Sequence, residues 1–517
     1  MKAFTLLWVT VGVAFLLLGS GCTEVEDVQA ASGSVDAGDS KESNALIYTG
    51  AGELEAVVFD EMNETHTPGV AVAVVSGDKI VFARGFGVSN IETGTPVTPD
   101  TLFRIGSTTK MYTAATLAML AEDGKLDLNE PIGSYVDGLS PGLSQLTTHQ
   151  LLTHTAGLRD EASSYGRHDE AALSEEVRAF DDSLFFTGPG EIFSYSNPGY
   201  ALAGLVAEET GDKSYADQVK ESLFLPLGMN RTTFRPTEAM TFPLAQGHYL
   251  LPDGSPAVIR PYTDNAGNWP AGFMFSNVNE LSRFAIAFMN EGRLEGKEVL
   301  SPSAISKLST PYSPVISSYN NGSYGYGLFI HNSRGVQIVE HPGGMEGFTC
   351  QFLMVPEHRF AVIILSNTYG TKFPKSTEKA MELFLPLEAE MEEDSEANVS
   401  LPVTGDGMID ESITDEGMSG EEMIGKAIDE EVMTEEEMTA YAGHYYNSPE
   451  LYLDLVKKDD TLFLKIGELE APVKKIGESR FLATNPFLGQ PLEFILVPGE
   501  DGKPEYLHMS HRALKKI

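Results

Sequence analysis

Three short groups of residues in this chain carry side chains that can do nucleophilic and acid–base chemistry. The first group is Ser107 and Lys110, in Phe103-Arg104-Ile105-Gly106-Ser107-Thr108-Thr109-Lys110. Residues three apart lie on one face of a helix, about one turn from each other. Because burial favours the neutral form of a lysine, a buried Lys110 could accept the proton of the Ser107 hydroxyl. The pair therefore predicts a serine nucleophile activated by a lysine.

The residues after Gly106 predict the helix that would position this pair. A stretch that is apolar nearly all round follows the serine, and Gly124 ends it. Such a pattern is typical of a buried helix, with Ser107 at its start. A backbone N–H at a helix start can also face a developing oxyanion. The apolar positions are Met111, Ala114, Ala115, Leu117, Ala118, Met119 and Leu120.

Ser-x-x-Lys on its own is weak evidence, because the chain contains it twice more. Ser76 to Lys79 lies in a polar turn between two β-type runs, 69–75 and 80–83, that predict a hairpin. Ser376 to Lys379 lies in a short helical stretch. Neither copy indicates a buried serine, so we interpret both as unrelated to the chemistry.

The second group is Tyr195 and Asn197, in Phe193-Ser194-Tyr195-Ser196-Asn197-Pro198-Gly199-Tyr200, which precedes a helix predicted from Ala201. A phenol near a lysine can relay a proton to a leaving group. An amide can hold both that lysine and a substrate carbonyl. Tyr-x-Asn also recurs at Tyr319 to Asn321 and Tyr445 to Asn447, and a single tyrosine of this kind is more often structural than catalytic.

The third group is Glu340-His341-Pro342-Gly343-Gly344, at the edge of a late β-type region. The two glycines would let a substrate approach the backbone closely, and Pro342 suits an edge strand. His341 alone has an ordinary structural interpretation. His154, in Gln150-Leu151-Leu152-Thr153-His154-Thr155-Ala156-Gly157-Leu158, is interpreted as structural because it lies at a helix end.

In this order, the three groups resemble the serine β-lactamase and penicillin-binding-protein superfamily. The resemblance is strongest to the branch of class C β-lactamases, DD-peptidases, D-aminopeptidases and related esterases, and covers roughly residues 50–385. It implies that Ser107 is the acylated nucleophile and that Lys110 shares in proton transfer. Further phrases typical of the branch are 150–158, Pro226-Leu227-Gly228-Met229-Asn230, Tyr324-Gly325-Tyr326-Gly327-Leu328 and Ala271-Gly272.

The resemblance assigns the other site residues as well. Tyr195 would be the general base and later the acid to the leaving group, although sequence does not settle whether Lys110 or Tyr195 takes the serine proton. Asn197, His341 and Gly343 would bind substrate, and the N–H groups of Ser107 and Gly344 would form the oxyanion hole. No metal or organic cofactor is implied.

One departure from the family pattern bears on the substrate. Many relatives carry Lys-Thr-Gly where this chain has His341-Pro342-Gly343. A histidine carries charge only when protonated, near an ordinary pKa of about 6.5, and Pro342 lacks a hydroxyl. We therefore expect penicillins and peptides with a terminal carboxylate to be poorer substrates than neutral or ester-like acyl groups.

The N-terminus predicts export. Lys2 precedes an apolar run, 4–18, that is short for a spanning helix of roughly 20 residues, and small residues lead to Cys22. This resembles a lipobox with Gly19 at a position where an aliphatic residue is usual. We expect an extracytoplasmic lipoprotein anchored at Cys22, with secretion or an uncleaved anchor as the alternatives. The formal net charge of -40 argues against nucleic-acid partners.

The composition along the chain predicts five segments. The late segments are an acidic stretch with one basic residue, Lys426, read as a linker, and short β-type runs that begin after a capping-box pair, Thr434 and Glu437. Strands at both ends with helices between predict an α+β domain whose single sheet joins distant parts of the chain, with an inserted helical lobe. The segments are an export signal (1–22), a tether (23–44), a β-lactamase-like domain (45–387), the linker (388–433) and a small β-barrel-like, lipocalin-like domain (434–517).

Two functions remain open on sequence grounds. The first is a serine hydrolase acting on D-amino-acid peptides, β-lactams or small esters and amides, as a monomer or a homo-oligomer. The second is a non-catalytic envelope receptor on the same fold. Because each of the three groups contains residues that can act in nucleophilic attack, proton transfer or substrate binding, the sequence favours the hydrolase.

Overall fold

The computed structural model describes residues 41–316, 322–388, 431–485 and 491–517. The predicted export signal with Cys22, most of the tether and most of the acidic linker lie outside these residues. The chain divides into two units, Met1–Leu46 and Ile47–Ile517. In the described ranges, no helix has both the length and the apolar composition that a membrane span requires.

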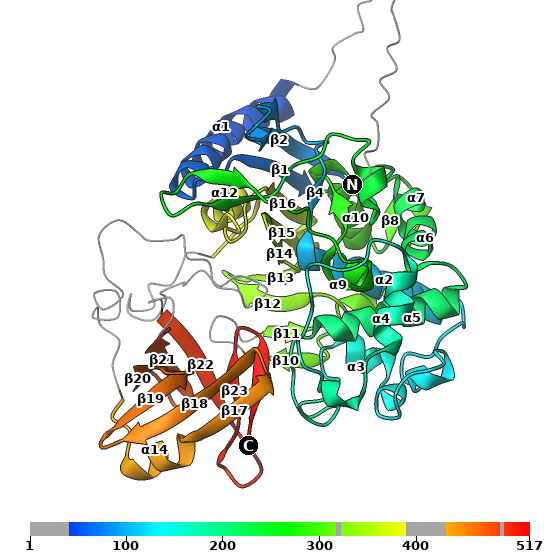
Figure 1. Cartoon of the computed structure of the whole chain (residues 1–517). Coiled ribbons are helices and arrows are strands. Elements are labelled where there is room, and N and C mark those ends of the chain that lie inside the picture. Colours follow the sequence, from blue (N-terminus) through cyan, green and yellow to red (C-terminus); the bar gives the residue numbers. More distant parts are fainter. Residues whose placement is uncertain (1–40, 317–321, 389–430, 486–490) are drawn as a thin grey trace, which may run out of the picture. The chain divides into compact units, whose positions relative to one another are not determined.

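The sheet domain, residues 47–388, is built around one large antiparallel sheet (Figure 1). Val70 of its first strand lies opposite Ser366, so segments from the two ends of the domain are neighbours, as predicted. The strands are, in spatial order, β10 (Ser313–Val315), β11 (Gly322–Tyr324), β12 (Phe329–Ser333), β13 (Val336–Glu340), β15 (Phe348–Val355), β16 (Phe360–Ser366), β1 (Gly69–Ser76), β2 (Lys79–Asn90) and β3 (Thr95–Pro96), with β14 (Gly343–Met345) beside β15.

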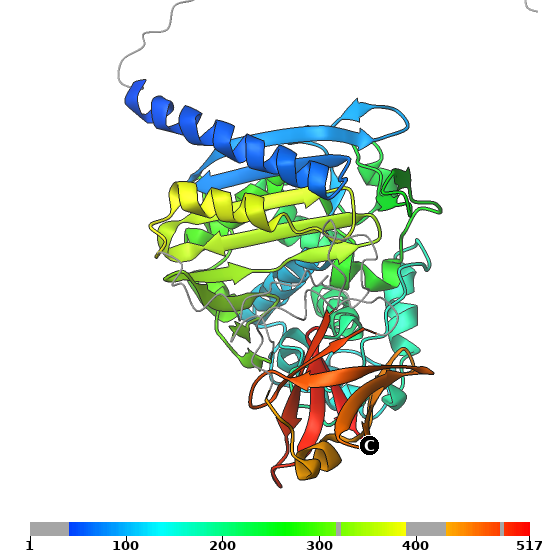
Figure 2. The ribbon, with the colours of Figure 1, turned by 90° about the vertical axis from the view of Figure 1, so that its left-hand side faces the viewer.

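Both faces of the central strands are covered, which explains their continuous apolar sequences. Alternate residues of β1 point to two different cores: Val70, Val72 and Val74 to one, Ala71, Ala73 and Val75 to the other. The first core contains buried residues of α1 (Lys41–Glu64) from Leu54 on and of α12 (Pro374–Phe384). Figure 2 shows α1 and α12 crossing the same face of the sheet.

The opposite face packs against α10 (Val278–Met289), α2 (Lys110–Glu122) and an inserted helical lobe. This confirms the predicted α+β architecture. The helices of the lobe and its surroundings are α3 (Thr148–Leu152), α4 (Ala171–Arg178), α5 (Asn197–Gly211), α6 (Tyr215–Val219), α7 (Leu225–Leu227), α8 (Pro236–Ala239), α9 (Trp269–Gly272) and α11 (Pro302–Leu308). The short strand pairs are β4 (Phe103–Arg104) with β7 (Phe275–Ser276), β5 (His248–Leu250) with β6 (Pro256–Val258), and β8 (Arg293–Leu294) with β9 (Lys297–Glu298).

The barrel domain, residues 431–517, is a closed antiparallel barrel preceded by α14 (Glu435–Tyr441). The predicted capping box is present, because Thr434 accepts from the N–H of Glu437 and the Glu437 carboxylate accepts from that of Thr434. Buried residues such as Leu464, Phe494 and Leu514 fill the interior, as expected for eight strands. The strands are β17 (Gly443–Ser448), β18 (Leu451–Lys458), β19 (Thr461–Ile466), β20 (Leu469–Lys475), β21 (Arg480–Thr484), β22 (Pro491–Pro498), β23 (Pro504–Met509) and β24 (Arg512–Lys516).

Candidate active site

Ser107 lies in a short 3-10 turn, Gly106–Thr109, that runs directly into α2. Gly106 adopts a left-handed backbone with φ of 52°. A β-carbon at this position would also lie 2.5 Å from the backbone nitrogen of Gly344. Only glycine satisfies both conditions without strain. The turn thus brings the backbone around Ser107 next to β14, the strand that carries the third predicted group.

Lys110 is fully buried at the start of α2, and its ammonium group has three oxygen partners. Its Nζ lies 3.1 Å from Ser107 Oγ, 2.6 Å from Asn197 Oδ1 and 2.6 Å from the carbonyl oxygen of Ala271. These contacts fix the ammonium group against the serine hydroxyl. The structure therefore brings together residues from the first and second predicted groups, 87 positions apart in the chain.

Tyr195 is buried next to Lys110, whose Nζ lies 4.7 Å from the centre of the tyrosine ring. The centre of the Tyr195 ring also lies 4.2 Å from the centre of the His154 ring, and the two ring planes are inclined by 32°. The Nδ1 of His154 accepts from the backbone N–H of Ser196 at 3.1 Å. Burial and the charge of Lys110 hold the pKa of His154 well below its ordinary value, so this histidine is a neutral support for the tyrosine segment.

Asn197 is the first residue of α5, four positions before the predicted helix start at Ala201. The hydroxyl of Ser196 caps the helix by accepting from the N–H of Gly199, and Pro198 fits in the first turn. The predicted start at Ala201 is too late, because Ser196 and Pro198 are themselves the start signals of this helix. The early start places the Asn197 side chain at a helix terminus that is held rigidly.

His341 is buried, and both of its ring nitrogens have partners within the sheet domain. Nδ1 lies 2.7 Å from the carbonyl oxygen of Pro342, to which it donates, and Nε2 accepts from the hydroxyl of Tyr324 at 2.9 Å. Burial and the charge of Lys110 hold its pKa well below the ordinary value of a histidine. The buried ring therefore stays neutral near pH 6.5, where an exposed histidine would gain its charge.

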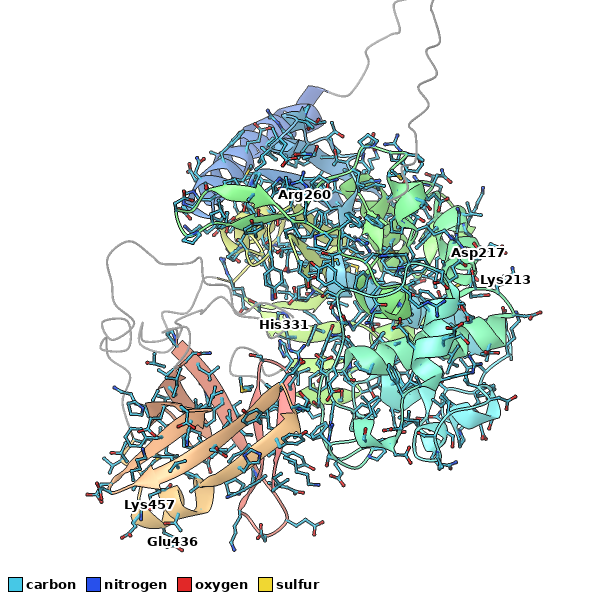
Figure 3. The ribbon with its side chains drawn as sticks, viewed as in Figure 1. Lys213, Asp217, Arg260, His331, Glu436 and Lys457 are labelled. Carbon is cyan, nitrogen blue, oxygen red and sulfur yellow. The ribbon has the colours of Figure 1, made fainter. Side chains whose placement is uncertain are left out.

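Gly343 and Gly344 lie on β14, and no larger residue would fit at Gly343. A β-carbon on Gly343 would come within 1.9 Å of the carbonyl oxygen of Ile105. The preceding residue of the third group, Glu340, is held by the His331 Nε2 at 3.1 Å and by the Gln351 amide at 2.6 Å. Figure 3 labels His331 on β12, beside the strand that ends at Glu340.

A family model described as Beta-lactamase matches residues 54–384, well over half of the chain. The chain belongs to the β-lactamase family. It is thereby a member of the serine hydrolases of the β-lactamase and DD-peptidase type.

Individual relatives are distant from this member of the family. Protein flp of Staphylococcus aureus (strain MW2) is 26% identical over 332 residues, which are 63% of this chain and 65% of that protein, so the match spans slightly less than two thirds of the relative. The structure of SurE has a TM-score of 0.72 at 22% identity and covers 92% of this chain and 100% of its own. D-amino acid amidase from Ochrobactrum anthropi SV3, with L-phenylalanine amide, has a TM-score of 0.55 at 23% identity, covering 65% and 98%.

The other sequence copies of the motifs lie elsewhere in the fold. Ser76 ends β1 in the predicted hairpin. Ser376 is buried, contrary to expectation, but its hydroxyl donates to Glu61 at 2.6 Å, and Lys379 instead pairs with Glu53. Tyr445 to Asn447 lie on β17 of the barrel, and Tyr319 to Asn321 lie outside the described residues.

Sequence reasoning missed three groups that contact the predicted site residues. The carbonyl of Ala271 receives the Lys110 ammonium group, although 271–272 had been noted as part of a family phrase. Asp160 accepts from the backbone N–H of Asn197 at 2.8 Å, and Arg512 of the barrel binds Asp160. Asp160 follows the phrase 150–158 by two residues, which was a usable signal, whereas no local pattern marks Arg512.

Proposed function

We propose that this chain is an extracytoplasmic serine hydrolase that cleaves amide or ester bonds through an acyl-enzyme on Ser107. The observation that carries the proposal is the buried side-chain nitrogen of Lys110, which lies 3.1 Å from Ser107 Oγ and is fixed by two further oxygens. A serine hydroxyl becomes a useful nucleophile when a base lies within hydrogen-bond reach and is itself oriented by a third group. Asn197 and Ala271 supply that orientation.

The chemistry proceeds in two halves. The Ser107 oxygen attacks the substrate carbonyl while its proton passes to the Lys110–Tyr195 pair, and the oxyanion faces the N–H groups of Ser107 and Gly344. The pair then delivers a proton to the departing nitrogen or oxygen, which leaves Ser107 acylated. In the second half, water loses a proton to the same pair and attacks the acyl carbon. The pair returns that proton to Ser107 Oγ as the bond to the acyl group breaks and the acid product leaves.

For the substrate, we propose small amides, peptides and esters without a free carboxylate, D-amino-acid derivatives foremost. A relative on this fold is named D-amino acid amidase, and another, SurE, has been crystallised with D-Leu. His341 is neutral and both of its ring nitrogens are hydrogen-bonded within the protein. It supports the preference against carboxylate-bearing substrates, because it brings no positive charge to meet a carboxylate. β-Lactams belong to the substrates that we expect to react slowly.

Labelling with a fluorophosphonate, followed by intact mass spectrometry, tests the proposal. We expect one adduct on the wild-type chain, its loss in Ser107→Ala, and its retention in Ser76→Ala, which removes the serine of a second Ser-x-x-Lys copy. A folded wild-type chain that takes up no label would overturn the hydrolase and favour the receptor. The membrane part of the proposal is separate: palmitate labelling should mark the wild type and not Cys22→Ser.

A further inference from the structure

The barrel domain reaches the segment that carries Tyr195. The backbone N–H of Tyr195 donates to the carbonyl oxygen of His511 at 2.9 Å. The two preceding residues are bonded to the barrel as well. The N–H of Ala513 donates to Ser194 Oγ at 3.2 Å, and His508 Nε2 lies 3.2 Å from the carbonyl oxygen of Phe193. Three successive residues of the tyrosine segment are thus bonded to the β23–β24 hairpin of the barrel.

An ion pair continues this contact toward the nucleophile. Arg512, the first residue of β24, places Nε at 2.7 Å and Nη2 at 2.5 Å from Asp160 Oδ2. Both side chains are 6% exposed, so water screens the pair poorly. The other oxygen of Asp160 accepts from the N–H of Asn197 at 2.8 Å. The contacts therefore run from Arg512 through Asp160 to Asn197, whose amide oxygen holds Lys110.

The hairpin turn that presents these groups has an unusual backbone. Met509 pairs with Arg512, which leaves Ser510 and His511 as a two-residue turn, and both have positive φ, 46° and 65°. Such turns normally use Asn-Gly or another glycine-containing pair. Non-glycine residues in this conformation are strained, and the strain persists where surrounding contacts fix the backbone. Here the bonds to Tyr195 and from Arg512 Nη1 to the Ser510 carbonyl, at 3.0 Å, supply that constraint.

We propose that Arg512 is a positioning residue of the active site, acting through Asp160 on Asn197 and Lys110 and, with the hairpin turn, on Tyr195. This inference rests on the hydrolase function proposed above. The guanidinium carbon of Arg512 also lies 5.4 Å from the centre of the Tyr195 ring, so the same side chain lies against Tyr195 and reaches Lys110 through Asp160 and Asn197. In this arrangement the barrel is a working part of the active site and holds the residues around Ser107 in reactive alignment.

The rival explanation is that Arg512 only attaches the barrel to the sheet domain, and the fold provides a matched control. Lys515, on the same strand, joins the barrel to the sheet domain through Thr187 at 3.0 Å and Glu191 at 3.3 Å. None of these contacts reaches the tyrosine segment at 193–197. If Arg512 only fastens the barrel, Lys515→Met and Arg512→Gln should affect activity alike.

The test is the kinetics of fluorophosphonate labelling of the full chain, resolved into the inactivation rate constant and the concentration for half-maximal rate. We expect Arg512→Gln and Asp160→Asn each to lower the rate constant on the order of 10²-fold, as a misplacement of about 1 Å in an active site does. The half-maximal concentration should change little. Arg512→Lys should recover part of the loss, the double variant should lose no more than one single variant, and Lys515→Met should react like the wild type.

The outcomes separate the two proposals. A wild type that is not labelled refutes the hydrolase function and the role of Arg512 with it. A labelled wild type with an equally reactive Arg512→Gln refutes only the positioning role. If Arg512→Gln and Lys515→Met lower the rate constant equally, Arg512 only attaches the barrel to the sheet domain and the positioning role is refuted. Because Asp160→Asn perturbs the same pair from the sheet domain, it tests the inference even if the barrel of Arg512→Gln does not fold.

Discussion

Acidification should destabilise the contact between the barrel and the tyrosine segment, and His508 provides a direct measure of this effect. This side chain is 2% exposed, between the barrel and the carbonyl of Phe193. Burial, with the nearby charge of Arg512, lowers its pKa to about 4, although the hydrogen bond to Phe193 opposes the shift. In the unfolded chain a histidine titrates near a pKa of about 6.5.

The size and sign of the effect follow from these two values. Between pH 6.5 and pH 4, the unfolded chain binds a proton at this position and the folded chain does not, so the free energy of unfolding falls as the pH falls. Integrated from pH 7 to pH 5, one such histidine costs about 2 kcal/mol. The loss is absent above about pH 7 and levels off below about pH 4. His511, with a pKa lowered to about 3, acts in the same direction.

Urea unfolding followed by far-UV circular dichroism at pH 7 and pH 5 measures this cost. His508→Asn keeps an N–H donor for the Phe193 carbonyl but cannot be protonated. We expect the wild type to lose about 2 kcal/mol more than the variant between the two pH values. All other histidines are common to both chains and cancel in the difference. Equal acid losses in the two chains would refute the reasoning, because they would show that His508 is not buried as a neutral group.

Three further predictions concern the site itself. Lys110→Ala should slow fluorophosphonate labelling by at least about 10²-fold, with unchanged circular dichroism; labelling at the wild-type rate would exclude Lys110 from proton transfer. Gly343→Ala should destabilise the chain by about 1–3 kcal/mol in thermal unfolding, because its β-carbon would meet the Ile105 carbonyl. The control is Gly52→Ala in helix α1, whose new β-carbon meets no atom within 4 Å and which should not lower the stability, because alanine favours a helix over glycine. Nitrocefin should turn over far more slowly than a neutral p-nitrophenyl ester, and a turnover number that rivals a dedicated β-lactamase would contradict the proposed preference.

Much of the fold was readable from local sequence because the strongest patterns belong to its most buried elements. The run at 69–75 became β1 and the late β-type region includes β15 and β16; in these strands both faces are covered and nearly every residue is apolar. The barrel was harder to read. Strands such as β17 and β20 mix polar or charged residues with few apolar ones, so their local patterns are weak.

The sequence by itself determined the chemical identity of the three groups and the buried helix that follows Ser107, because these depend on residue type and on spacing within a few turns. The tertiary structure decided which Ser-x-x-Lys copy meets an asparagine and a tyrosine, since only folding brings residues 87 positions apart to 2.6 Å. It also decided that His341 is neutral, because burial and the Tyr324 hydroxyl are long-range facts. Above all, it joined Arg512 to Asp160 across 352 positions. A salt bridge between distant surfaces leaves no periodic trace in the sequence, because its geometry exists only when both domains have folded and met.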